Sequence, residues 1–146
     1  MIDDQTRILV LCTGNSCRSQ MAEGILRHFL AKQKLLNAAA AVRSAGIEIH
    51  GLNPIAVRVM GEIDIDISHQ TSNHVDDYAE LEFDYVITVC DNAANACPTF
   101  PARTELLHFP FDDPAKTTGN KEEILTEFRR VRDQIRAKIV ELLSAR

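Results

Sequence analysis

Residues Arg7–Leu11 read RILVL and residues Cys12–Ser19 read CTGNSCRS, so a short apolar run leads directly into small polar residues. A continuous apolar run of this length is typical of a strand that is buried on both faces of a sheet. From Gln20 to about Leu36, apolar residues recur at helical spacing. A buried strand, a polar loop and a helix in this order indicate an α/β fold with a parallel sheet.

The rest of the chain extends this alternation. Asn53 resembles an N-cap with Pro54 at the first helical position, so a helix should begin there and stop near Gly61. The alanine-rich stretch 32–41 fits either an extension of the first helix or a surface connection. We predict a three-layer α/β sandwich with a four-stranded parallel sheet, and ligands at the carboxyl ends of its strands. The other expected elements are strands at Val42–Ser44 (ending at Gly46), Phe83–Val89 and Glu105–Phe109, and an amphipathic helix from Ile124 to Leu142.

Length, charge and cysteine content narrow the class of protein. The 146 residues fit one domain over 1–146. A net charge of −5 argues against a general binder of nucleic acid or membrane surfaces, because such proteins use basic patches. The apolar run before Cys12 is too short for a signal peptide or a membrane span, so we expect a cytoplasmic protein. Its four cysteines are then more often catalytic thiols, metal ligands or core residues than structural disulfides.

Cys12 and Arg18 form a C-x5-R pattern between the first strand and the first helix. Amides of the loop and of the first helical turn should point to a common centre, where the helix dipole adds partial positive charge. Gly14 permits a positive φ angle, and Asn15 tolerates the left-handed region. Arg18 offers a planar fork of donors that matches a tetrahedral oxyanion, and the same field favours the thiolate of Cys12. The residues expected to bind the oxyanion are Thr13, Gly14, Asn15, Ser16, Cys17, Arg18 and Ser19, of which Ser19 is also expected to donate to the thiolate.

Other interpretations remain open on the residues alone. The loop pattern also occurs by chance, as a turn of small residues with two buried cysteines, and it is not a Walker loop because Gly-Lys-Ser/Thr is absent. The four cysteines also suggest a structural zinc site, although the C-x4-C and C-x6-C spacings strain the usual pattern and Arg18 would oppose a cation. An anion-binding or redox-sensing module is a third possibility.

The stretch Leu11–Gly24, LCTGNSCRSQMAEG, resembles the phosphate-binding loop of the low-molecular-weight protein tyrosine phosphatases and of the related thioredoxin-coupled arsenate reductases. The resemblance implies the flavodoxin-like topology of that family. Both branches have a second cysteine near the position of Cys17, which we interpret as a loop-packing thiol. Gln20, where phosphatases commonly have proline, favours the reductases. The resemblance covers nearly the whole chain, through residues 44–48, 64–68, 86–91, 95–98, 111–115 and 128–133.

The same resemblance implies a mechanism for arsenic detoxification, with catalytic residues Cys12, Cys90, Cys97, Arg18 and Asp113. Cys12 attacks arsenate, Cys90 displaces arsenite by attacking Cys12, and Cys97 then attacks Cys90. Oxidation of two thiols to one disulfide supplies the two electrons of the reaction, and thioredoxin then reduces the resulting disulfide. Asp113 resembles the general acid that protonates a leaving oxygen, although a surface turn is the more common explanation of the Asp-Asp-Pro pattern by itself.

The alternative function is that of a low-molecular-weight protein tyrosine phosphatase, which has no need of Cys90 and Cys97. Phosphatases usually follow Asp-Pro with aromatic residues that flank a phosphotyrosine ring, whereas Ala115 and Lys116 follow here.

The expected disulfide also constrains the segment between its cysteines. A helix over residues 90–97 would hold the Cα atoms of Cys90 and Cys97 about 10 Å apart, beyond the roughly 7 Å that a disulfide allows. Oxidation should therefore unwind that segment.

No cofactor and no metal are expected, with one qualification. Asn15, Glu23 and Ser44 match polar positions that bind a potassium ion in some reductases. Asn73 stands where those members have an acidic residue, and Gln70 stands where some have histidine. These differences weigh against a cation, and Glu23 is explained equally well as a first-turn helix residue. The expected partners are thioredoxin and arsenate, with no nucleic acid and no membrane, and the chain is expected to be a monomer.

Overall fold

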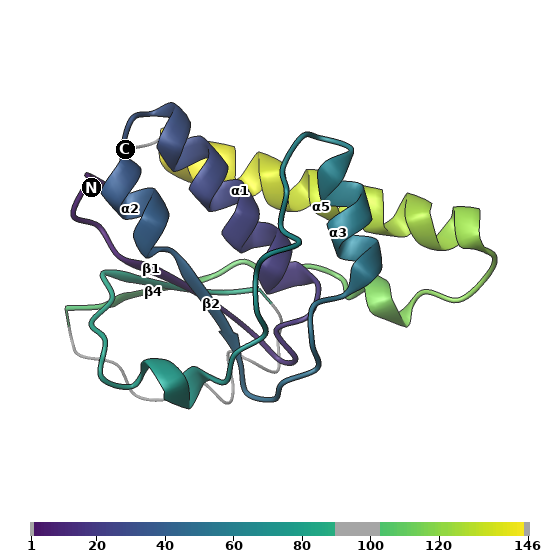
Figure 1. Ribbon diagram of the computed structural model, residues 1–146, viewed down its shortest axis with the longest axis horizontal. Helices are drawn as coiled ribbons and strands as arrows, with labels where there is room; N and C mark the ends of the chain where they lie inside the picture. Colours follow the sequence, from purple (N-terminus) through teal and green to yellow (C-terminus); the bar gives the residue numbers. More distant parts are fainter. Residues whose placement is uncertain (1, 90–102, 145–146) are drawn as a thin grey trace.

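The computed structural model describes residues 2–89 and 103–144 of the chain. Strands and helices are interspersed along its sequence, as Figure 1 shows. The strands are β1 (Ile8–Cys12), β2 (Arg43–Gly46), β3 (Tyr85–Thr88) and β4 (Glu105–His108). The helices are α1 (Arg18–Lys32), α2 (Leu36–Ala41), α3 (Pro54–Gly61) and α5 (Lys121–Ser144), with 3-10 turns η1 (Val75–Tyr78) and η2 (Pro114–Lys116).

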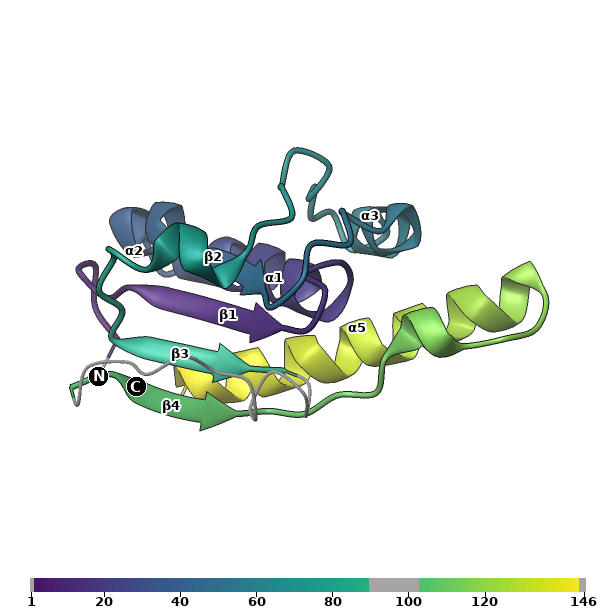
Figure 2. The ribbon, with the colours of Figure 1, turned by 90° about the horizontal axis from the view of Figure 1, so that it is seen from below.

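The four strands form one sheet in the order β2-β1-β3-β4, and every neighbouring pair is parallel. Figure 2 shows the arrows of β1, β3 and β4 pointing the same way, so their carboxyl ends meet at one edge of the sheet. β1 lies in the middle and all five of its residues are buried, as its apolar sequence predicts. The predicted α/β fold, with a four-stranded all-parallel sheet flanked by helices, is confirmed.

Helices α1 and α5 lie side by side along one face of the sheet (Figures 1 and 2). α5 presents an apolar stripe to this interface, because its buried residues recur at steps of three and four. The described ranges share one apolar core, and within them no helix combines the length and the hydropathy needed to cross a bilayer. The apolar residues that α5 buries are Leu125, Phe128, Val131, Ile135, Ile139 and Leu143.

The predicted start of α3 is confirmed in detail. The Asn53 side chain accepts hydrogen bonds from the amides of Ile55 (2.8 Å) and Ala56 (3.3 Å), and Pro54 occupies the first turn. The strands agree with the predicted ranges to within two residues, β3 being shorter at both ends.

The alanine-rich stretch after α1 is a separate helix, not a continuation. Lys34 has a φ angle of 64°, in the left-handed region that ends a helix, and α2 starts anew at Leu36. The carboxylate of Asp4 accepts a hydrogen bond from the Asn37 amide (2.9 Å) and so caps the new helix from outside it. Ala38 and Ala39 are buried against the core, which explains the small residues there.

Candidate active site

The loop between Cys12 and Arg18 is held in shape by main-chain hydrogen bonds to a strap, which we define as residues 47–53. Four loop carbonyls accept from amides of the strap and therefore point outward. Because the peptide unit is planar and trans, each outward carbonyl turns the next amide to the opposite side, toward the centre of the loop. The donor and acceptor pairs are Ile47 to Cys12 (3.3 Å), Glu48 to Thr13 (2.9 Å), His50 to Gly14 (3.0 Å) and Asn53 to Ser16 (3.1 Å).

The left-handed residue of this loop is Asn15, with a φ angle of 48°. Gly14 permits a positive φ angle but does not adopt one. Gly14 serves a different purpose, because a Cβ atom there would lie 2.3 Å from Nδ1 of His50. The glycine lets the His50 ring approach the loop closely.

A pocket of about 290 Å³ opens above this loop and brings together Cys12, Arg18 and Asp113. Nη1 of Arg18 donates to the carbonyl of Phe111 (3.0 Å), and its Nη2 lies 3.5 Å from Oδ2 of Asp113. The other carboxylate oxygen of Asp113 accepts from the Ala115 amide (3.0 Å) and caps η2. A thiol, a guanidinium and a carboxyl group thus share one small cavity at the carboxyl edge of the sheet. The other lining residues are Thr13, Gly14, Ser16, Cys17, His50, Ala115 and Lys116.

Two of the predicted oxyanion-binding residues turn their side chains away from this pocket. Asn15 and Ser19 are fully buried, and Nδ2 of Asn15 donates to Oγ of Ser19 (2.8 Å) and to Oγ of Ser44 (3.0 Å). Oδ1 of Asn15 accepts from the Asn73 amide (2.8 Å). These contacts fix the left-handed backbone of Asn15. Its side chain therefore shapes the loop, and only its main-chain N–H remains to bind an anion.

Cys17 is buried at the side of the same pocket. Burial raises the pKa of its thiol to about 11, against the lowering influence of its hydrogen bond to Ser16, and the charge of Asp113 acts in the same direction as burial. The thiol of Cys17 is therefore protonated at neutral pH. This state suits a packing role, as the sequence predicts for Cys17.

Sequence reasoning missed two contributors to the site. The sequence pattern gives His50 no role in the site, yet His50 lines the pocket, with its Nε2 2.7 Å from Oε2 of Glu48. Gln20, considered only for its family preference, is buried and donates to the Asn15 carbonyl (3.0 Å) and to the Thr71 carbonyl (2.9 Å). The one available signal for His50 was its position shortly after the strand that pairs with β1.

Cys90 and Cys97 lie outside the described residues. The described chain ends before them at Val89, whose amide donates to the carbonyl of Leu11 (3.0 Å), next to Cys12.

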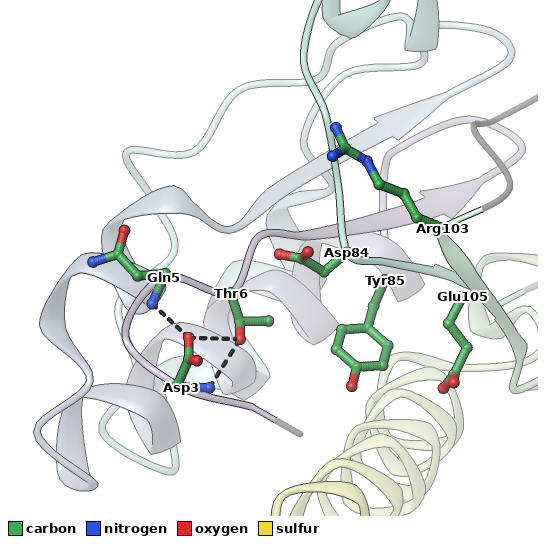
Figure 3. Close-up of a pocket in the computed structure, with 7 residues that line it drawn as sticks. All are labelled: Asp3, Gln5, Thr6, Asp84, Tyr85, Arg103 and Glu105. Carbon is green, nitrogen blue, oxygen red and sulfur yellow. Dashed lines mark hydrogen bonds between the residues drawn. The ribbon is translucent and has the colours of Figure 1, made fainter.

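Another hollow, of about 330 Å³, lies at the amino edge of the sheet and is shown in Figure 3. Three of its lining residues bind one another, since the Asp3 carboxylate accepts from the Gln5 amide (2.8 Å) and from the Thr6 hydroxyl (3.3 Å). Ligands of parallel sheets bind at the carboxyl edge, and none of the described residues that line this hollow is a cysteine. The pocket above Cys12 is therefore the candidate active site.

The profile of a family described as low molecular weight phosphotyrosine protein phosphatase matches residues 7–145. An arsenate reductase of Shouchella clausii is 51% identical over 132 residues, which cover 90% of this chain and 91% of that one. An arsenate reductase of Bacillus subtilis is 48% identical over 134 residues, which cover 92% of each chain. A solved structure of an arsenate reductase in the phosphate binding state is similar with a TM-score of 0.74 at 29% identity, covering 97% of this chain and 98% of that one. The matched stretch includes every residue that lines the pocket.

Proposed function

Because the chain belongs to the low molecular weight phosphotyrosine protein phosphatase family, and within it to the arsenate reductases, we propose that it reduces arsenate to arsenite by a relay of three thiols. The relay uses Cys12, Cys90 and Cys97, and thioredoxin returns the enzyme to its reduced form. In this proposal the protein serves arsenic detoxification. It works in the cytoplasm and as a monomer. The observation that carries the proposal is the single pocket in which Cys12, Arg18 and Asp113 meet above the loop amides.

The first step is nucleophilic attack on bound arsenate. The loop amides and the Arg18 fork hold three oxygens of the anion, with the arsenic atom facing Sγ of Cys12. The thiolate forms an S–As bond, and one oxygen leaves as water after it takes a proton from Asp113. Asp113 is suited to this task because it lines the same pocket as Cys12, with its Oδ2 3.5 Å from Nη2 of Arg18.

The second step transfers the electrons. The thiolate of Cys90 attacks Sγ of Cys12, the S–As bond breaks, and its electron pair passes to arsenic, which falls from As(V) to As(III). Arsenite leaves, and a Cys12–Cys90 disulfide remains. Cys97 then attacks Cys90 and releases Cys12 as a thiolate. The dithiol of thioredoxin reduces the final Cys90–Cys97 disulfide and is itself oxidised.

The described residues support the pairing of Cys12 with Cys90. β1 and β3 are neighbouring parallel strands, and Leu11 is paired with Thr88 in their register. Neighbouring strands lie about 4.8 Å apart. Val89, the residue before Cys90, therefore lies beside Leu11, the residue before Cys12.

A tyrosine phosphatase is the second candidate, since the same loop and acid would serve phosphoester cleavage. The lining of the pocket, as far as the structure describes it, argues against an aryl substrate. Ala115 and Lys116 line the pocket, and no Phe, Tyr or Trp is among the described residues that do so. A phosphotyrosine ring would lack the flanking aromatic faces that stabilise it.

One assay separates these functions. Oxidation of NADPH is followed with arsenate, thioredoxin and thioredoxin reductase, and in parallel with glutaredoxin or mycoredoxin systems. We expect arsenate-dependent turnover with thioredoxin, and none from Cys12→Ser. Hydrolysis of an aryl phosphate without any arsenate reduction would instead assign the chain as a phosphatase.

A further inference from the structure

A continuous series of polar side chains runs beneath the active-site loop, from Arg27 on the outer part of α1 to Asn15 within the loop. Arg27 pairs with Oε2 of Glu23 through Nε (3.0 Å) and Nη2 (2.8 Å). Oε1 of Glu23 accepts from the Ser44 hydroxyl (2.5 Å), and Ser44 accepts from Nδ2 of Asn15 (3.0 Å). Asn15, Glu23 and Ser44, three side chains from a loop, a helix and a strand, thus meet as one cluster.

This cluster does not fit a bound cation. A cation needs several free oxygen atoms, yet Asn15 turns its amide nitrogen toward Ser44, and its oxygen accepts from the Asn73 amide. Both oxygens of Glu23 have partners in the chain. Among the described residues no buried side-chain nitrogen or oxygen lacks a hydrogen-bond partner.

The charge of the cluster is also balanced already. Glu23 supplies one negative charge, and Arg27 supplies one positive charge in direct contact with it. An added metal ion would leave a positive charge without a counter-charge next to buried groups, which is unfavourable. Asn73 adds no charge, and its Oδ1 accepts from the Thr71 hydroxyl (2.7 Å).

Arg27 also contacts the main chain shortly before Ser44. Its Nη2 donates to the carbonyl of Val42 (2.7 Å), two residues before Ser44 in the chain. One guanidinium therefore ties α1 to the start of β2 and fixes the spacing between Glu23 and Ser44. The side chain of Glu23 is 8% exposed, so its negative charge without Arg27 would be buried and largely uncompensated.

We propose that Arg27 is a positioning residue for the oxyanion loop, acting through Glu23, Ser44 and Asn15, and that it makes anion binding independent of monovalent cations. The inference rests on the oxyanion site of the proposed function, but not on arsenate reduction. Without Arg27, Oε2 of Glu23 loses its partner. Rotation of the Asn15 and Ser44 side chains would then turn their oxygens toward the uncompensated carboxylate, and the rearranged cluster recruits a potassium ion. Anion affinity then becomes dependent on potassium.

The test measures binding of inorganic phosphate by calorimetry, in potassium chloride and in choline chloride at equal ionic strength. Wild-type protein should bind phosphate equally in both salts. Arg27→Gln should bind about five-fold more weakly in choline chloride, which corresponds to about 1 kcal/mol, and potassium should restore most of the affinity. Arg27→Lys, which keeps the charge, should bind nearly as the wild type does in both salts.

Arg129→Gln is the matched control, because the Arg129 side chain is 34% exposed against 33% for Arg27 and pairs with Glu62 outside the cluster. It should lower the melting temperature without changing phosphate affinity in either salt. A potassium-dependent affinity in the wild type, which requires no variant to fold, would overturn the proposal. So would an Arg27→Gln protein that binds phosphate in choline chloride as tightly as the wild type. Neither result bears on arsenate turnover, so failure here leaves the proposed function standing.

Discussion

The amide of Val89 donates a 3.0 Å hydrogen bond to the carbonyl of Leu11, and these two residues directly precede Cys90 and Cys12. The contact belongs to the pairing of the two central strands, which are buried and cannot separate without disrupting the core. In the proposed relay, this contact fixes where the chain enters Cys90 relative to Cys12. The order in which the thiols react is therefore open to a direct test.

Removal of single thiols should stop the relay at different points. Cys97→Ser retains Cys12 and Cys90, so it should reduce one equivalent of arsenate and then stop as a Cys12–Cys90 disulfide. Cys90→Ser should release no stoichiometric arsenite, because the attacker on Cys12 is missing. Peptide mapping by mass spectrometry identifies the trapped species. Cys17→Ser is the control and should turn over, since Cys17 is a buried, protonated thiol. Sustained turnover by Cys97→Ser with thioredoxin as sole reductant would rule out the three-cysteine scheme.

Arg18→Lys should raise the KM for arsenate by at least about ten-fold. A lysine retains the charge but loses the planar fork, and one hydrogen bond to a charged group is worth about 1.5–3 kcal/mol. The inhibition constant of phosphate should rise in parallel, because both anions use the same pocket. Arg130→Lys is the control, since Arg130 pairs with Asp112 close by but does not line the pocket. Unchanged anion affinity in Arg18→Lys would exclude Arg18 from the anion site.

Cys17 should resist alkylation in the folded protein at pH 8. With a pKa of about 11, its thiolate fraction there is roughly one in a thousand, and burial limits access further. Unfolding in urea restores an ordinary thiol, with a pKa near about 8.5, and labelling should become fast. Iodoacetamide followed by peptide mapping gives both rates. Equal labelling rates with and without urea would contradict the environment described for this thiol.

Glu62 should stabilise the fold down to strongly acidic pH. The Arg129 guanidinium, joined by Arg132, lowers the pKa of Glu62 to about 2. A lowered carboxyl pKa stabilises the folded state above the unfolded value of about 4.3, and this contribution is lost as the pH falls through about 2.

The measurement is a comparison of wild type with Glu62→Gln by thermal melting. At pH 7 the variant should melt about 3 °C lower, as expected for about 1 kcal/mol in a domain of this size. The difference should shrink as the pH is lowered from about 4.3 toward 2. A difference that stays constant over this range would show that the carboxylate charge of Glu62 makes no contribution.

Features with a local cause could be predicted from the sequence. The spacing of Cys12 and Arg18 between an apolar run and a helical repeat was sufficient to locate the loop, and the Asn53-Pro54 pair was sufficient to start α3. Both signals depend on neighbours a few residues apart in the chain. The place of Asp113 in the pocket was expected only from resemblance, since a surface turn is the more common explanation of its own pattern.

Features with a distant cause could not be predicted. His50 reaches the pocket because β2 pairs with β1, which sets Gly46 beside Cys12 and carries the strap past the loop. Gln20 acquires its role only when residue 71 folds back over α1. The break before α2 depends on Lys34 adopting a left-handed conformation that its residue type does not favour.

Main-chain contacts with the strap set the shape of the loop between Cys12 and Arg18. The four hydrogen bonds of the strap to the loop come from amides, so a strap side chain that has no other role can vary while the loop keeps its shape. Ile49, which is more than half exposed, is one such position. Proline is the exception, because it has no amide hydrogen to donate. Residues 47, 48, 50 and 53 are therefore closed to proline, and the chain places its own proline, Pro54, one residue beyond the last of these donors.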